Sequence, residues 1–302
     1  MKRIIVLGGG YGGVLTAKKL AKRLRRHRGV RITLIDKNPY HTLLTELHEV
    51  AAGRVSEHAV CADLAKIFAG FRNVEVVLDE IRRIDFSGRM LKGDRQSYAY
   101  DYLVIGTGSK PAFFGTPGAD QYAFTLWSYE DAVRLKEHTR EMFRKAVRER
   151  DPAQRRAMLS FVVVGGGFTG IEMIGELAEY TRELCTDFHV DPQDVSLHVA
   201  DMAGSILSIL PEPLIRKAER RLRRLNVNIL TGAAITEVRP DAVIVGGREI
   251  PSRTVIWTAG VEGSDLVGST EVEQQGRKRI VINEKLQVPA HPNVYVVGDN
   301  MF

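Results

Sequence analysis

The stretch Gly8-Gly9-Gly10-Tyr11-Gly12-Gly13 decides the fold of this chain, because it recurs as Gly165-Gly166-Gly167-Phe168-Thr169-Gly170. Each copy follows a short apolar run, Ile4–Leu7 or Phe161–Val164, and opens a helical pattern. In such a unit the first glycine permits a tight turn, the second lets backbone N–H groups approach a pyrophosphate, and the third lets the helix pack on its strand. The pyrophosphate lies at the positive end of the helix dipole. Two copies predict two dinucleotides held against each other, rather than two ordinary glycine-rich turns.

The composition of the 302 residues is that of a soluble globular protein with room for two domains, since 44% are hydrophobic and 26% are charged. No apolar run approaches the roughly 18 residues that span a bilayer. The start, Met1–Leu7, imitates a signal peptide but then breaks on glycines, so we expect a strand there. Cys61 and Cys185 are too few for a disulfide framework and fit a reducing cytoplasm.

The net charge of +6 is concentrated in two basic clusters. The first comprises Lys18, Lys19, Lys22, Arg23, Arg25, Arg26, Arg28 and Arg31, and the second comprises Arg216, Lys217, Arg220, Arg221, Arg223 and Arg224. A solvated helix face is the favoured interpretation, and attraction to an anionic membrane surface is the alternative. We expect no nucleic acid as a partner, because no recognition motif accompanies the charge.

The order of the predicted elements indicates an α/β fold with two Rossmann-like dinucleotide-binding domains. The first nucleotide unit is predicted as strand 3–7, helix 12–27 and strand 31–36, and the second as strand 160–164, helix 168–185 and strand 195–200. Short strands at 74–78, 81–85 and 89–92 read as an antiparallel flap. Strands near 233–238, 241–245 and 253–257 are predicted to complete the second unit.

Two segments of the sequence indicate the domain boundaries: a turn-rich crossover into the second domain and a later crossing of the chain back to the first domain. Pro111–Pro117 is rich in proline and glycine, and an amphipathic helix is predicted at about 128–150. After Trp257-Thr258-Ala259-Gly260 the chain crosses back, and a last strand ends in Gly298-Asp299. We therefore expect one domain from 1–112 and 261–302, with a second domain, 113–260, inserted in it.

An acid at the end of the second strand of each unit selects the nucleotide. Such a carboxylate accepts hydrogen bonds from an adenosine ribose and repels the 2′-phosphate of NADP. Asp36 occupies this place in the first unit and Asp201 in the second. No arginine immediately after Asp201 is placed to hold a 2′-phosphate, so the second site is expected to prefer NADH over NADPH.

Together with Gly106-Thr107-Gly108 and Gly298-Asp299, the order of motifs resembles that of the FAD- and NAD-dependent disulfide-reductase-like flavoproteins over the whole chain. The resemblance implies FAD in the first domain and NADH in the second, with Asp299 bonding the ribityl chain of the flavin. For hydride to pass from the nicotinamide to the flavin, the two rings must stack.

The branch of that superfamily is indicated by the segment Pro39–Gly53, which contains no cysteine where disulfide reductases carry a redox pair. Its Pro39-Tyr40-His41 and Ala51-Ala52-Gly53, with Gly165–Glu172 and Gly175-Glu176-Leu177, resemble the type II NADH dehydrogenases, the single-subunit NADH:quinone oxidoreductases of respiratory chains. This implies an enzyme in which NADH passes hydride to FAD and two electrons go on to a quinone, without proton pumping.

Glu172 is the expected catalytic residue. We expect it in the first turn of its helix, and the resemblance implies that it orients the nicotinamide and lies between the nicotinamide and quinone regions. Its alternative role is that of a helix-stabilising acid. His41 and His48 are more often structural in such positions, Cys61 and Cys185 read as packing residues, and no spacing suggests a metal.

The predicted cofactor-binding residues divide between the two domains. Those for FAD are Gly8, Gly10, Tyr11, Gly12, Gly13, Asp36, Lys37, Thr45, Thr107, Gly108 and Asp299. Those for NADH are Gly165, Gly167, Phe168, Thr169, Gly170, Glu172, Asp201, Ala259 and Gly260.

The chain stops at Met301-Phe302, where members of the type II family continue. We interpret it as a C-terminally truncated form whose full-length parent is peripheral on the cytoplasmic face of the membrane. The expected partners of that parent are NADH, a quinone, the anionic membrane surface and, as an alternative to a monomer, a second copy of the chain. The alternatives to this function are a sulfide:quinone or ferredoxin reductase-like enzyme and a non-catalytic nucleotide-binding fragment.

Overall fold

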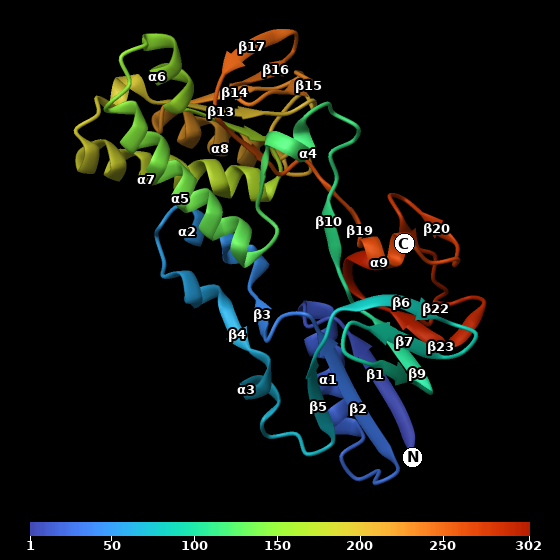
Figure 1. Cartoon of the computed structure of the whole chain (residues 1–302). Helices are drawn as coiled ribbons and strands as arrows, with labels where there is room; N and C mark the ends of the chain where they lie inside the picture. The colour runs from blue at the N-terminus through green and yellow to red at the C-terminus, as the bar shows by residue number, and fades with distance from the viewer. The chain divides into compact units, whose positions relative to one another are not determined.

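The computed structural model describes residues 1–302, which form two compact units (Figure 1). The first unit contains Met1–Thr42, Cys61–Lys110 and Val261–Phe302, and the second contains Leu43–Val60 and Pro111–Gly260. Both are mixed α/β units built on a parallel sheet, so the predicted fold class is confirmed.

The first unit is built on a six-stranded sheet in the order β22-β23-β9-β1-β2-β5. Its strands are β1 (Lys2–Leu7), β2 (Val30–Asp36), β5 (Val74–Leu78), β9 (Tyr102–Ile105), β22 (Gln287–Val288) and β23 (His291–Val296). All pairs are parallel except β22–β23. Strand β1 lies between β2 and β9, so its carboxyl end is the point where the strand order reverses, which is the usual place for a ligand.

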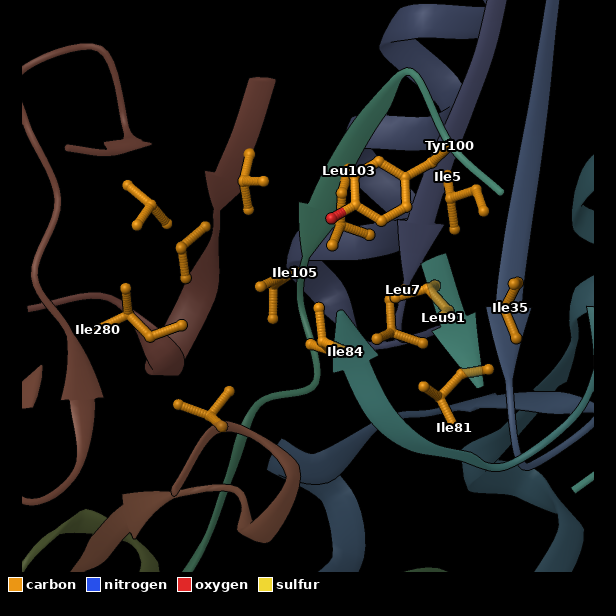
Figure 2. Packing of buried hydrophobic residues seen from close by; sticks show 14 residues of the cluster. Ile5, Leu7, Ile35, Ile81, Ile84, Leu91, Tyr100, Leu103, Ile105 and Ile280 are labelled. Carbon is orange, nitrogen blue, oxygen red and sulfur yellow. The ribbon is translucent and has the colours of Figure 1, made fainter. Parts of the chain in front are cut away.

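Alternate residues of β1 enter two different cores, as the two-residue period of a strand requires. Val6 joins the cluster formed with α1 (Tyr11–Arg23) and α3 (Leu64–Phe68). Ile5 and Leu7 point the other way and join Ile84 and Leu91 from the neighbouring antiparallel sheet (Figure 2). The parallel sheet is therefore covered on both faces, by helices on one and by strands on the other.

The predicted antiparallel flap at 74–78, 81–85 and 89–92 was partly wrong. The segment Val74–Leu78 is β5, which pairs in parallel with β2 at the edge of the main sheet. Helix α3 lies between β2 and β5 in the chain. A helical crossover of this kind makes the strand that follows it parallel to the strand that precedes it. The antiparallel sheet is instead formed by β6 (Ile81–Asp85), β7 (Met90–Gly93) and β8 (Ser97–Ala99).

The second unit carries a five-stranded sheet in the order β11-β18-β12-β13-β14, and every pair in it is parallel. Its strands are β11 (Phe124–Thr125), β12 (Ser160–Val164), β13 (Ser196–Ala200), β14 (Val227–Leu230) and β18 (Thr254–Trp257). The principal helices are α5 (Tyr129–Ala146), α6 (Pro152–Met158), α7 (Phe168–Phe188) and α8 (Glu212–Arg224). Every residue of β12 is buried, as expected of a central parallel strand.

The three strands expected to complete the second unit lie in it, but two of them lie outside its parallel sheet. Strands β15 (Ile235–Val238), β16 (Ala242–Val245) and β17 (Arg248–Pro251) form a separate antiparallel sheet. Only β18, close to the predicted 253–257, belongs to the parallel sheet. Its outer strand β14 was missed, because it follows the highly charged α8 after a turn at Leu225 and Asn226, where Asn226 has a φ of +59°.

The segment Leu43–Val60 belongs to the second unit, whereas the sequence placed it in the first domain. Its helix α2 (Leu47–Ala51) buries Leu47, Val50 and Ala51 and packs on α5 and α7, as Figure 1 shows. Gly53, at a φ of +71°, lies so close to the ring of Tyr180 on α7 that a Cβ would stand 3.0 Å from it. The small residues of Ala51-Ala52-Gly53 thus permit helix packing within the second unit.

The remaining elements are short. In the first unit they are β3 (Tyr40–Thr42), β4 (Cys61–Asp63), β10 (Ser109–Pro111), β19 (Val261–Gly263), α9 (Asp265–Gly268), β20 (Gln274–Gln275), β21 (Arg279–Ile280) and the 3₁₀ turn η4 (Gly298–Asn300). In the second they are η1 (Leu44–Glu46), η2 (Glu57–Val60), α4 (Ala119–Tyr122) and η3 (Pro192–Asp194). None of the helices has the length and apolar character needed to cross a membrane.

Burial of His138 makes the stability of the second unit depend on pH. The ring lies 4.3 Å from that of Phe124, and Nε2 is 3.1 Å from the Arg253 carbonyl oxygen, to which it donates. Burial lowers the pKa of His138 to about 4, from an ordinary value of 6.5. The unfolded chain therefore binds this proton first, so the contribution to stability is complete above pH 6.5 and is lost as the pH falls toward 4.

We expect His138→Gln to reduce the acid sensitivity of unfolding. Between pH 7.5 and pH 5 the free energy of unfolding of the wild type falls by up to about 2 kcal/mol, because His138 takes up a proton in the unfolded chain. The variant has no such group at this position. The free energies of unfolding from urea titrations at the two pH values should therefore differ by less for the variant than for the wild type. An unchanged difference between the two pH values would show that His138 does not govern this transition.

Candidate functional site

The first glycine loop connects β1 to α1 and leaves an open cradle. Gly8 has a φ of +107°, which turns the chain sharply at the end of the strand. A Cβ on Gly13 would collide with the Gly8 carbonyl oxygen, so this glycine allows the helix to pack on its strand. A Cβ on Gly10 would meet nothing within 4 Å. The space in front of Gly10, at the start of α1, is therefore available to a phosphate group.

The second loop reproduces this geometry between β12 and α7. Gly165 has a φ of +111°, and a Cβ on Gly170 would collide with the Gly165 carbonyl oxygen. A Cβ on Gly167 again meets nothing within 4 Å. The helix-opening residues of the two loops, Tyr11 and Phe168, are both exposed. The two copies thus agree in backbone geometry as well as in sequence.

Each strand-end acid holds its glycine loop through the backbone. One carboxylate oxygen of Asp36 accepts from the Gly9 N–H at 2.5 Å, and the other accepts from the Asn38 N–H at 2.7 Å. Asp201 does the same with the N–H groups of Gly166 and Ala203, at 2.6 Å and 2.7 Å. Both acids therefore lie beside their cradles, as predicted.

Burial raises the pKa of the Asp36 carboxyl, although the N–H groups of Asn38 and Gly9 oppose the shift. The same amide donors favour the ionised form of Asp36, which presents acceptor oxygens at the edge of the first cradle.

The carbonyl of the middle glycine has a different partner in each loop. Nδ1 of the buried His41 donates to the Gly9 carbonyl oxygen at 2.8 Å, and the His41 ring stands edge-on to Tyr11. In the second loop the Leu207 N–H donates to the Gly166 carbonyl oxygen at 2.7 Å. His41 is therefore a structural residue that fixes the first loop, and the Leu207 contact had no signal in the sequence.

The crossover Gly106-Thr107-Gly108 lies against the first cradle, since a Cβ on Gly8 would collide with the Gly106 carbonyl oxygen. Thr107 is held in place by the Asn300 side chain, which donates to its Oγ1 at 2.7 Å. Ser109 Oγ donates to Asp299 Oδ2 at 2.9 Å. The crossover and the Gly298-Asp299 motif thus meet.

The end of β23 also approaches the first loop directly. A Cβ on Gly12 would stand 3.2 Å from the Val297 side chain and 3.5 Å from the Gly298 backbone nitrogen. Asp299 therefore lies on the chain segment next to the cradle. Lys37 is exposed beside Asp36 and makes no ion pair in the structure.

In the second unit the segment Thr258–Gly260 has the corresponding place. A Cβ on Gly165 would stand 2.9 Å from the Cα atom of Ala259. Thr258 Oγ1 donates to the Val164 carbonyl oxygen at 2.8 Å. Gly260 follows with a φ of +155°, and its carbonyl oxygen accepts from the Ala112 N–H at 3.0 Å. The return of the chain therefore forms one side of the second cradle.

Glu172 is not in the first turn of its helix, so that detail of the prediction was wrong. Helix α7 starts at Phe168, its first turn holds no acid, and Glu172 is the fifth residue. The helix dipole acts within the first turn, so it stabilises Glu172 less than expected. The neighbouring side chain on α2 is His48, whose Nδ1 lies 3.9 Å from Glu172 Oε2.

A stronger ion pair lies one helical turn further along α7. Arg54 donates to Glu176 at 2.5 Å and to Glu49 at 2.6 Å, which ties the end of α2 to α7. The segment 43–60 thus places a histidine and an arginine opposite two carboxylates of α7. The sequence singled out His48 and Glu172 separately, but the pair could not be found from it.

The other predicted residues fall into two groups. Thr45 lies in η1 of the second unit and donates to Glu46 at 3.3 Å, so it is not part of the unit that holds the first cradle. Cys61 is half-buried and Cys185 is buried, and burial raises the pKa of the Cys185 thiol, which disfavours the reactive thiolate. No group of three or more His, Cys, Asp or Glu side chains is arranged to hold a metal ion.

Comparison with known proteins gives a match along the chain. The model of the family described as pyridine nucleotide-disulphide oxidoreductase matches residues 2–301. The type II NADH:quinone oxidoreductase Ndh of Mycobacterium tuberculosis is 32% identical over 98% of this chain and 66% of its own length. The type II NADH:quinone oxidoreductase of Staphylococcus epidermidis is 32% identical over 99% of this chain and 74% of its own length. The chain therefore spans about two thirds to three quarters of these relatives.

A solved structure agrees with the fold. The structure of NDH2 from Plasmodium falciparum in complex with NADH has a TM-score of 0.89, with 21% sequence identity over 99% of this chain and 64% of that one. At this identity the likeness concerns the arrangement of the elements alone.

The open cradle at Gly10 can be tested by filling it. Gly10 has φ −74° and ψ −174°, which alanine adopts without strain, so Gly10→Ala should fold normally. The added methyl group occupies the phosphate position, and we expect the affinity for FAD to fall by at least about tenfold, or 1.4 kcal/mol. Calorimetric titration of FAD and the melting temperature of the ligand-free protein measure both effects.

Gly29→Ala is the matched control, because a Cβ there also meets nothing within 4 Å but lies away from the cradle. Equal FAD affinities of the two variants would contradict the assignment of this loop.

Proposed function

Because this chain belongs to the pyridine nucleotide-disulphide oxidoreductase family, we propose that it is the nucleotide-binding part of an NADH:quinone oxidoreductase. In this proposal FAD occupies the cradle of the first unit and NADH that of the second. The observation that carries it is the duplication of the cradle, with an acid, an open glycine and a crossover in each copy. The curated relatives with this name support the choice of reaction.

When bound, FAD supplies the redox chemistry, since it accepts a hydride from NADH and passes two electrons to a quinone. The contribution of this chain is to bind and orient. Gly10, Asp36 and Asp299 would hold the pyrophosphate, the adenosine ribose and the ribityl chain of FAD. Gly167 and Asp201 would hold the corresponding parts of NADH.

Asp201 also accounts for the choice between NADH and NADPH. Its two carboxylate oxygens face the loop, so a 2′-phosphate on the ribose would meet a negative charge at short range. The residues that follow are Met202, Ala203 and Gly204, none of which is a cation. We therefore assign NADH to this site.

Glu172 is the residue that we place beside the nicotinamide. It is half exposed on the second turn of α7, and His48 stands opposite it on α2. A carboxylate with a histidine neighbour can accept a hydrogen bond from a carboxamide and hold a proton at Oε2. Because Glu172 and Glu176 are four residues apart, the Arg54 bridge also reduces repulsion between the two carboxylates.

For the full-length parent we propose a quinone as electron acceptor and a peripheral position on an anionic membrane surface. The basic cluster from Lys18 to Arg31 supports the second point through charge complementarity. A homodimer is retained as an alternative to a monomer, and sedimentation of the parent distinguishes them.

The purified parent should be yellow, and anaerobic NADH should bleach its flavin absorbance. NADPH should bleach it at least about tenfold more slowly, because of the charge of Asp201. A quinone added afterwards should restore the colour. Protein that binds NADH but neither retains nor takes up FAD would instead be a nucleotide-binding module.

Comparison of Asp201→Ser with the control Asp191→Ser measures the effect of the Asp201 carboxylate on the preference for NADH. Both aspartates accept a backbone N–H two residues ahead, at 2.7 Å and 2.9 Å, but only Asp201 lies at the cradle. The first variant should lose most of the preference for NADH and the second should keep it.

Glu172→Gln should slow turnover of the parent at least about tenfold, while the bound FAD stays unchanged. Glutamine keeps the size of the side chain but loses the charge that faces His48. Glu179→Gln is the matched control, since Glu179 is equally exposed on α7 and pairs only with Arg182 and Arg221. Steady-state rates and FAD content per chain measure the effect, and equal rates for the two variants would remove Glu172 from the reaction.

A further inference from the structure

The two basic clusters of the sequence differ in how their charges are neutralised. On α8 the cations are interleaved with acids: Arg216 pairs with Glu212, Arg221 with Glu179 and Arg223 with Glu219. This arrangement is that of a solvated helix face laced with ion pairs. In the first cluster only Arg31, on β2, has an ion-pair partner, Glu75, at 3.0 Å. Three of the six cations of the second cluster are therefore ion-paired, against one of the eight in the first.

Part of the first basic cluster lines a groove in the first unit. A cavity of about 820 Å³ lies at the amino-terminal ends of β1, β2 and β5, next to the end of α1. Five cations line it, namely Lys22, Arg25, Arg28, Arg31 and Arg72, with Glu75 as the one carboxylate. The side chains that line the groove therefore carry four more positive than negative charges. Its volume lies within the range of small-molecule sites.

The groove is lined by segments that are hydrogen-bonded to one another. The Asn73 side chain donates to the Ala21 carbonyl oxygen at 3.0 Å, which ties the turn before β5 to α1. The Lys2 N–H donates to the Gly29 carbonyl oxygen at 2.6 Å, which closes the other side. Phe71 and Val30 add half-buried apolar surface to the lining. The groove thus combines fixed walls, an apolar part and converging positive charge.

The clustering needs a partner because like charges repel one another. Cations near the end of α1 gain from the helix dipole, whereas Arg72 lies in the turn between α3 and β5, so the cations of the groove come from separate segments. Arg25, Arg28 and Arg72 make no ion pair with a side chain of the protein. Guanidinium groups match phosphate in geometry, with paired N–H donors. We propose that this groove is a binding site for a molecule that carries phosphate groups, separate from both dinucleotide cradles.

The ligand chemistry is a multiply charged phosphate next to a modest apolar surface. Two sources present it: a soluble polyphosphate compound and the headgroup of an anionic phospholipid. Both are attracted by the same cations, and both attractions weaken with salt. Only the second requires the groove to reach a bilayer surface, so a soluble probe and a vesicle separate them.

The test uses the full chain, with FAD and NAD⁺ in excess so that the cradles are filled. The soluble probe is inorganic tripolyphosphate, titrated by calorimetry. The lipid probe is a vesicle of phosphatidylcholine with phosphatidylglycerol, compared with pure phosphatidylcholine by co-sedimentation. At least one probe should bind, with tripolyphosphate indicating the soluble source and phosphatidylglycerol alone indicating the lipid.

The triple variant Arg25→Gln/Arg28→Gln/Arg72→Gln should weaken that binding by more than about tenfold, because each cation contributes about a few-fold. Lys217→Gln/Arg220→Gln/Arg224→Gln on α8 removes the same charge from the second basic cluster, which does not line the groove, and should leave binding within about twofold of the wild type. Unchanged melting temperatures confirm that both variants fold.

Two results overturn the proposal. Equal loss in the two variants would mean that net charge alone attracts the probes, and binding of neither probe below about 1 mM would mean that the groove is a solvated surface. Neither result depends on quinone reduction, so the proposed function and the groove can fail separately.

Discussion

The structure depends on the close approach of a helix to the strand that precedes it, repeated once in each unit. In both loops the last glycine leaves room for the carbonyl oxygen of the first, and any larger residue would push the helix away. Because the helix starts so close to the strand, its unpaired N–H groups open at the carboxyl edge of the sheet. In each unit the strand-end acid and a later segment of the chain meet the glycine loop at this edge. The later segment contains Gly106 in the first unit and Ala259 in the second.

The acids have a second role in this arrangement. Each binds its loop through one oxygen and the start of the next segment through the other, so the cradle is held before any ligand arrives. A preformed site loses less conformational entropy on binding than a flexible one. The third contact, at the carbonyl of the middle glycine, comes from a histidine ring in one unit and a backbone N–H in the other. Duplicated loops can therefore keep one geometry while the surrounding sequences diverge.

The features that could be predicted from the sequence are those determined by neighbouring residues. The glycine loops, their strands and the strand-end acids follow from local steric rules, and the structure has them where expected. The errors concern pairing between distant segments. Val74–Leu78 has the composition of any strand, and only its partner β2 decides that it is parallel. Strand β14 was missed, and only the pairing of β15 with β16 decides that they form a separate antiparallel sheet.

The segment 43–60 shows most clearly why a motif does not reveal its own surroundings. Its Leu47-His48-Glu49 lies close in sequence to the first glycine loop, which suggested a place in the first domain. The helix is only five residues long, so it cannot be stable alone and must take its position from a larger partner. That partner is the pair α5 and α7, more than 80 positions further along the chain. The packing brings His48 to Glu172 and Arg54 to Glu176, so a segment that reads as part of one nucleotide unit completes the charged face of the other.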